Sequence, residues 1–187
     1  MKKFLVLGLL LVVLASGAYS LDRNFGFGLG GNYSNSNGKA GGYSWNMDRS
    51  GVYLFGFFGI SQFIELNLGI IEKYVDELSI GGQKTGFGGE LSTALQLGIY
   101  GKWPFPLGTN FVFFPTAGVD FEFSLDEDWW NEFWFRGGVG MDFFPGQKFF
   151  IRAHLLFGYG LPFGGDEDLG VKDSIGAQIK LGVGWMF

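Results

Sequence analysis

The chain has 187 residues, a length that suits a single domain. It contains 34 glycines and 23 phenylalanines, and only 17% of its residues are charged, which is far from the composition of an ordinary soluble protein. Because there is no cysteine, the sequence excludes disulfides, a thiol nucleophile, a cysteine-based metal site and a lipidated N-terminal cysteine. The net charge of −5 argues against nucleic acid as a partner.

The first 20 residues predict a secretory signal peptide. Lys2 and Lys3 precede an apolar run at residues 4–14, and small residues follow at 15–20. Cleavage after Ala18 and cleavage after Ser20 both fit this pattern, so the mature domain is predicted to occupy residues 21–187. An uncleaved anchor is the alternative, but the apolar run is shorter than the ~20 residues that a spanning helix needs. Removal of the two lysines takes the net charge from −5 to −7.

The mature chain repeats one pattern, in which apolar residues alternate with glycine or polar residues. In residues 174–187, for example, Ile175 and Ile179 share one parity, and Gln178 and Lys180 share the other. Such alternation indicates strands whose two faces meet different environments. A tilted strand of roughly 9–11 residues can cross a bilayer. The pattern predicts eight strands, at residues 23–32, 50–60, 63–74, 90–102, 111–123, 132–143, 149–160 and 174–187.

The connections between these strands differ in length. Long polar segments at 33–49, 75–89, 124–131 and 161–173 alternate with short ones at 61–62, 103–110 and 144–148. Long loops on one rim and short turns on the other are typical of outer-membrane barrels, and both termini then lie in the periplasm. Aromatic residues near both rims predict the girdles found at membrane interfaces. They are Trp103, Phe105, Phe144 and Trp185 on the periplasmic side, and Tyr53, Tyr74, Trp129, Trp130 and Tyr159 on the other.

Alternation alone does not say which face lies inside, so a soluble barrel is the alternative. A water-facing strand surface normally carries Lys, Glu and Thr, whereas here glycine recurs at every second position. The interior of an eight-stranded barrel is also too narrow for most of these Phe, Leu and Ile side chains. The apolar face is therefore predicted to face lipid. Residues 50–60 are apolar at both parities, and their orientation stays open.

A signal peptide, eight alternating strands, alternating loop lengths and a C-terminal phenylalanine together resemble the small outer-membrane β-barrel proteins. This group includes the transmembrane domain of outer-membrane protein A and the proteins called X and W. The resemblance implies an all-β, eight-stranded, antiparallel, up-and-down transmembrane barrel. The terminal pattern that ends in Trp185 and Phe187 resembles the signal read by the barrel-assembly machinery. The partners implied are this machinery, periplasmic chaperones in transit and the lipids of the outer membrane, with the barrel itself a monomer.

The inward parity predicts a polar lumen. Unpaired charges in a narrow barrel are costly, so these side chains should pair, hydrogen-bond or be hydrated. Asp120 is expected near Arg136, and His154 near Lys180. The predicted network comprises Glu65, Asn67, Glu90, Ser92, Gln96, Asp120, Glu122, Arg136, Asp142, Arg152, His154, Gln178 and Lys180.

Two interpretations of this lumen remain. In the first, the charges form a structural lattice that closes the barrel; in the second, they line a water-filled passage. Acids outnumber bases in the predicted set, which favours cations if there is a passage. The inward glycines leave room for water, whereas Phe58, Trp134, Phe150 and Leu156 are expected to narrow the lumen.

His154, the single histidine, raises the question of an enzyme, because some lipid-modifying enzymes are eight-stranded outer-membrane barrels. A catalytic histidine needs a nucleophile within hydrogen-bond reach, and one acting on lipid should face lipid, whereas His154 has the inward parity. One histidine with scattered carboxylates is also a poor metal site. The sequence therefore predicts a protein without catalytic residues, metal or cofactor. Its expected role is structural or surface interaction through four extracellular loops, with a small channel as the first alternative and a lipid-modifying enzyme as the second.

Overall fold

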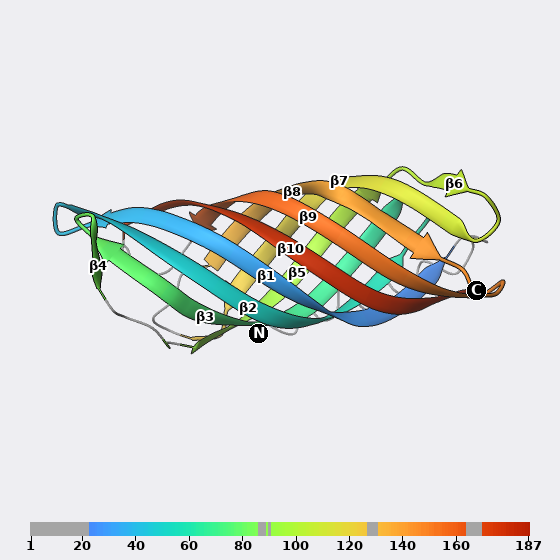
Figure 1. Cartoon of the computed structure of the whole chain (residues 1–187), viewed down its shortest axis with the longest axis horizontal. Helices are drawn as coiled ribbons and strands as arrows, with labels where there is room; N and C mark the ends of the chain where they lie inside the picture. The colour runs from blue at the N-terminus through green and yellow to red at the C-terminus, as the bar shows by residue number, and fades with distance from the viewer. Residues whose placement is uncertain (1–22, 86–88, 90, 127–130, 164–169) are drawn as a thin grey trace, which may run out of the picture.

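The computed structural model describes residues 23–85, 89, 91–126, 131–163 and 170–187 (Figure 1). The predicted signal peptide lies outside these residues and stays a prediction. Within the described ranges, no helix is long and apolar enough to cross a membrane. The long strands are β1 (Asn24–Ala40), β2 (Tyr43–Gly59), β3 (Ile64–Ile80), β5 (Leu91–Lys102), β7 (Phe111–Ser124), β8 (Asn131–Phe143), β9 (Phe149–Phe163) and β10 (Val171–Met186), with the short β4 (Gln83–Thr85) and β6 (Phe105–Leu107) between them.

The long strands form a closed ring in which every neighbouring pair is antiparallel. Each strand pairs with the next long strand along the chain, and β10 closes the ring on β1, with Leu29 opposite Leu181 and Ser36 opposite Ser174. The predicted all-β, eight-stranded, up-and-down barrel is therefore confirmed. The terminus end of the barrel holds the start of β1 and the end of β10; the hairpin end, opposite, holds the turn between β1 and β2.

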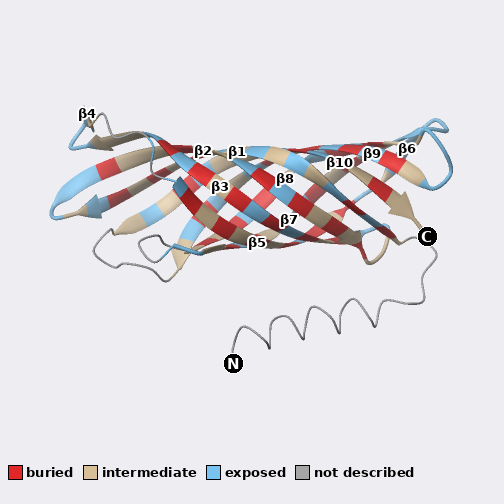
Figure 2. Cartoon of the chain, turned by 90° about the horizontal axis from the view of Figure 1, so that it is seen from below, coloured by how far each residue is buried: buried red, intermediate tan, exposed pale blue. Residues whose placement is uncertain are grey.

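The two faces of each strand differ as the alternation predicts. Buried and exposed residues alternate along the strands in Figure 2. On β1, for example, Leu29 is 67% exposed, whereas Ser34 and Ser36 are buried. The exposed face is apolar over the middle of the barrel, and this belt is the surface that a bilayer's hydrocarbon core would cover.

Strand β2, whose orientation the sequence left open, turns its larger aromatic side chains inward. Tyr53, Phe55 and Phe57 are buried, whereas Leu54 is exposed. The prediction that Phe58 narrows the lumen is therefore wrong, because Phe58 has the outward parity and its ring lies 6.5 Å from that of Phe187. Tyr53 likewise belongs to the interior and not to an interface girdle.

Two of the predicted long loops are instead extended hairpins. Strands β1 and β2 continue through residues 33–49 and turn at Gly41 and Gly42, and β3 and β4 turn at Gly81 and Gly82. All four glycines have positive φ, which suits a two-residue hairpin turn and is disfavoured for other residues. These hairpins project at the hairpin end on one side of the barrel (Figure 1), so its wall is taller there than along β5, β7, β8 and β9.

Candidate functional site

The candidate site is the lumen, where the structure places the predicted polar residues. All of those that it describes are buried and have the inward parity, while Glu90 lies outside the described residues. They are Glu65, Asn67, Ser92, Gln96, Asp120, Glu122, Arg136, Asp142, Arg152, His154, Gln178 and Lys180.

Sequence reasoning missed four charged residues of the lumen, Arg49, Lys73, Lys102 and Glu132. Three of them continue the parity of predicted lumen residues and could have been found in that way, but Arg49 fell inside a predicted loop. Among the described residues, the buried charged set holds six Arg and Lys side chains and five carboxylates. The expected excess of acid, and with it the preference for cations, is therefore wrong.

Most of these charges form two clusters. The hairpin-side cluster contains Arg49, Lys73, Asp120, Glu122, Glu132 and Arg136. Its ion pairs cross the lumen from β2 and β3 to β7 and β8, with Arg49 Nη2 2.8 Å from Glu132 Oε1 and Lys73 Nζ 2.6 Å from Glu122 Oε2. Lys73 also lies 2.9 Å from Glu132 Oε2, so it joins two carboxylates. Among the described residues, the cluster holds three cations and three anions, so its formal charges balance.

Arg136 completes the hairpin-side cluster. Its Nε lies 2.7 Å from Asp120 Oδ2, so the two residues are close to each other, as predicted. Its Nη2 lies 2.8 Å from Glu122 Oε1. The guanidinium also stacks 4.2 Å from the ring centre of Trp134, and Tyr100 donates a hydrogen bond to Asp120. Charge-assisted hydrogen bonds between buried side chains are strong. Removal of one partner, however, leaves the other as an uncompensated buried charge.

The terminus-side cluster contains Glu65, Lys102, Asp142 and Arg152, and it is also neutral. Arg152 donates to both oxygens of Asp142 at 2.6 Å, and across the lumen it pairs with Glu65. Lys102 Nζ lies 2.8 Å from the same Glu65 carboxylate. The guanidinium of Arg152 is held between phenylalanine rings, the nearest being Phe57 at 4.4 Å.

Lys180 lies between the two clusters and accounts for the extra positive charge. It is 1% exposed, and among the described residues no carboxylate lies within ion-pair distance of its ammonium. Its contacts are Asn67 Oδ1 at 3.5 Å and the rings of Tyr53, Phe55 and Tyr100, whose centres are 5.1–5.6 Å away. His154 is its neighbour across β9 and β10, as predicted.

Aromatic rings fill the space that the inward glycines leave. A Cβ added at Gly184 would lie 2.4 Å from the ring of Phe150, and one added at Gly140 would lie 2.3 Å from the ring of Phe114. Trp134 covers Gly160 in the same way at 2.8 Å. The expectation that these glycines leave room for water is therefore wrong at these positions, because the ring of the directly paired residue on the neighbouring strand takes the space. Rings and glycines are in close contact at these three places.

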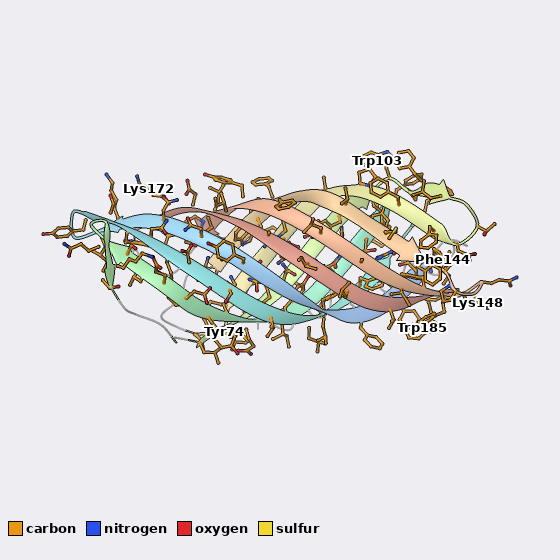
Figure 3. All side chains as sticks on the ribbon, viewed as in Figure 1. Tyr74, Trp103, Phe144, Lys148, Lys172 and Trp185 are labelled. Carbon is orange, nitrogen blue, oxygen red and sulfur yellow. The ribbon has the colours of Figure 1, made fainter. Side chains whose placement is uncertain are left out.

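Some of the aromatic residues predicted for the interfaces lie on the exposed surface, whereas Phe144 packs against the interior. Trp103 and Phe105 are exposed, and Figure 3 shows Trp103 and Trp185 at the terminus end. The rings of Trp185 and Phe187 lie 5.6 Å from that of Phe25, so the predicted assembly signal forms part of an exposed aromatic group. Phe144 instead packs 5.4 Å from the buried Phe150, at the mouth of the lumen. Trp129 and Trp130 lie outside the described residues.

Within the part of the chain that the structure describes, the carboxylates and the single histidine of the lumen are the candidate metal ligands, and the histidine is the candidate catalytic base. No group of three or more His, Asp or Glu side chains could hold a metal ion there. His154 is buried with its ring edge-on to Phe114 at 5.5 Å and to Tyr100 at 6.2 Å, which leaves it among aromatic side chains.

Comparison with known proteins identifies the fold. No protein-family model matches the sequence, and no curated protein matches it either. Among solved structures, the outer membrane protein OprG from Pseudomonas aeruginosa matches with a TM-score of 0.51 and 16% identity, over 90% of this chain and 96% of that chain. The chain has the fold of an outer-membrane β-barrel.

A second solved structure matches this chain with a lower TM-score. Ail, the attachment invasion locus protein of Yersinia pestis, has a TM-score of 0.39 and 14% identity, over 89% of this chain and 99% of that chain. At these identities the comparisons show the fold alone, and the role of the barrel has to come from its own lumen and surface.

Proposed function

We propose that this chain is an integral outer-membrane barrel whose lumen is closed and whose role is structural or surface interaction. The observation that carries the proposal is the packed lumen. Its two neutral ionic clusters and the rings of Phe57, Phe114, Phe150 and Trp134 are buried, none of them more than 7% exposed. A water-filled pore would leave such side chains wet.

The outer surface supports insertion in a membrane. An exposed apolar belt around a closed barrel is the surface that lipid covers in transmembrane β-barrels. The short connections and the aromatic group around Trp185 support placing the terminus end in the periplasm, with both termini there. The projecting hairpins β1–β2 and β3–β4 would then stand outside the cell as the interaction surface.

The proposal includes the partners that the sequence predicts. These are the lipids of the outer membrane, the barrel-assembly machinery and the periplasmic chaperones, with the barrel itself monomeric. It includes no catalytic step, and the burial of His154 in the lumen supports this. If lipid A in cells that express the protein gained or lost a group, the proposal of a non-enzyme would be wrong.

A small channel is the second candidate, and one observation favours it. Within the described ranges, both amide atoms of Gln178, Nε2 of His154 and the hydroxyl of Tyr53 are buried without a hydrogen-bond partner. Buried polar atoms of this kind are usually satisfied by ordered water. They lie between the two clusters, so a passage would still have to open both.

Conductance in planar bilayers tests the proposal. The refolded mature chain should insert and give a flat baseline, with insertion checked by its heat-dependent mobility on gels. The matched positive control combines Phe57→Ala and Phe150→Ala beside Arg152 with Trp134→Ala beside Arg136, so that both clusters lose a ring that fills the lumen, and it should admit ions. Reproducible single-channel steps from the unmodified barrel would contradict the closed lumen and favour the channel.

A further inference from the structure

The outward face of β1 changes its chemistry abruptly along the strand. Phe27, Leu29 and Gly31 belong to the apolar belt, and Tyr33 and Asn35 follow at the same parity towards the hairpin end. The neighbouring strands change in the same region, β2 between Val52 and Ser50 and β10 between Ile175 and Asp173. This transition marks the boundary between the hydrocarbon and the headgroup layer of the membrane.

Below the boundary, the belt contains an apolar groove of about 810 Å³. The groove is shallow and open along its outer side, so it resembles a surface channel for an extended chain and not an enclosed small-molecule cleft. At Gly31 the wall has no side chain, and an added Cβ would meet no atom nearer than 3.8 Å. The groove is lined by residues 27–31 of β1, Leu54 of β2, Ile151 of β9 and residues 179 and 181–183 of β10.

Above the boundary, the same strands carry a polar surface that we call the Asn–Tyr face. It consists of Tyr33, Asn35, Asn37, Asn46, Asp48, Tyr159 and Asp173. Tyr33 and Asn35 both donate to Asp48 Oδ1, at 2.8 and 2.7 Å. Asn37 and Tyr159 both donate to Asp173, Tyr159 at 3.0 Å. These bonds hold amides, carboxylates and half-exposed rings in a fixed arrangement before any ligand arrives.

We propose that the groove and the Asn–Tyr face together bind one glycolipid of the outer leaflet, with an acyl chain in the groove and an uncharged sugar headgroup on the face. Sugar hydroxyls donate and accept hydrogen bonds, which suits a surface of amides and carboxylates. The tyrosine rings offer apolar area beside these groups. The Asn–Tyr face contains two carboxylates and no Lys or Arg side chain, so it offers a phosphate no cation and favours an uncharged sugar. The inference rests on the proposed membrane location but not on a closed lumen.

Two lipids with identical acyl chains and different headgroups test the proposal. The purified full-length mature barrel in phosphatidylcholine nanodiscs is supplied with diglucosyl diacylglycerol or with phosphatidylglycerol, and bound lipid is counted by native mass spectrometry. The neutral glycolipid should be retained about tenfold better. Equal retention of the two lipids would overturn the assignment of the face to a sugar.

Two matched glycine variants test the groove. Gly31→Leu fills it and should lower glycolipid retention about tenfold. Gly137→Leu is the control, because Gly137 is also outward, with 3.8 Å to the nearest atom from an added Cβ, but lies on β8 away from the groove. Equal retention by wild type and Gly31→Leu would overturn the proposal.

The polar half of the site and the oligomeric state supply the remaining readouts. Asn35→Ala removes one bond to Asp48 and the pair of bonds with Asn46, and it should weaken glycolipid binding without affecting phosphatidylglycerol. If sedimentation shows a dimer that Gly31→Leu dissociates, a second copy of the chain occupies the groove and the lipid assignment is wrong. Channel steps in planar bilayers would leave all of these results unchanged, so failure of the closed lumen is a separate outcome.

Discussion

The two ionic clusters of the lumen have the same design but differ in their access to water. Each is neutral, and each joins strands that face one another across the barrel. The terminus-side cluster borders a pocket of about 90 Å³ at the mouth of the lumen, which Lys102 and Asp142 line. The hairpin-side cluster has Glu132 at its centre, 1% exposed and bound to Arg49, Lys73 and Ser174. Loss of a carboxylate should therefore lower the free energy of unfolding by different amounts in the two clusters, depending on whether water can replace the lost partner.

The largest effect is expected for Glu132→Gln. This change removes the charge of a 1% exposed carboxylate that pairs with both Arg49 and Lys73. Loss of one partner of a buried pair typically costs about 3–5 kcal/mol. Urea unfolding of the barrel in lipid vesicles should show a decrease of this size in the free energy of unfolding.

Glu65→Gln should cost less, about 1–3 kcal/mol, although it also affects two cations. Arg152 keeps Asp142, and Lys102 can be hydrated from the pocket at the mouth. The same vesicle assay compares the two variants directly. An equal or greater loss for Glu65→Gln would show that water does not distinguish the clusters.

Lys180→Met should change the free energy of unfolding by less than about 1 kcal/mol. Methionine fills a similar volume, and the buried ammonium that it replaces has aromatic rings and Asn67 in place of a carboxylate. Replacement of a buried charge by an apolar side chain is often neutral, because the cost of its dehydration is removed with it. A loss as large as that of Glu132→Gln would mean that Lys180 balances the acids of the hairpin-side cluster from a distance.

The smallest effect is expected for Lys84→Ala, on the projecting hairpin outside the barrel. Lys84 Nζ lies 2.6 Å from Glu77 Oε2, and this hydrogen bond raises the pKa of Lys84 above its ordinary value of 10.5. A raised lysine pKa contributes stability below the unfolded value, and the contribution is lost as the pH rises through the folded pKa. Between about pH 6 and pH 9 this contribution is present in full, but exposed pairs contribute little. The unfolding midpoints of the variant and the wild type should therefore coincide in this range. A clear shift would show that the hairpin is coupled to the barrel.

The extended hairpins show where the alternation of apolar and polar residues no longer predicts strands. Residues 34–38 read Ser-Asn-Ser-Asn-Gly, which is typical of a loop because neither parity is apolar. Above the membrane both faces of a strand can be polar, so the alternation that identifies a strand disappears there. The remaining signals were the pairs Gly41-Gly42 and Gly81-Gly82, which suit two-residue turns.

Local alternation was sufficient to locate the apolar-faced part of each of the eight long strands, to decide which face of most of them is outward, and to predict that Glu65, Asp120, Arg136 and Arg152 point inward. This was possible because the parity of a strand is a property of adjacent residues alone. Only the closed ring decided that Arg49 meets Glu132 and that Glu65 meets Arg152, across 83 and 87 residues of sequence. Such contacts depend on strand stagger and on the reach of long side chains across the barrel, and neither is encoded in a local pattern. The same closure brings β1, β2 and β10 together as one lipid-facing surface, although β10 is the last strand of the chain.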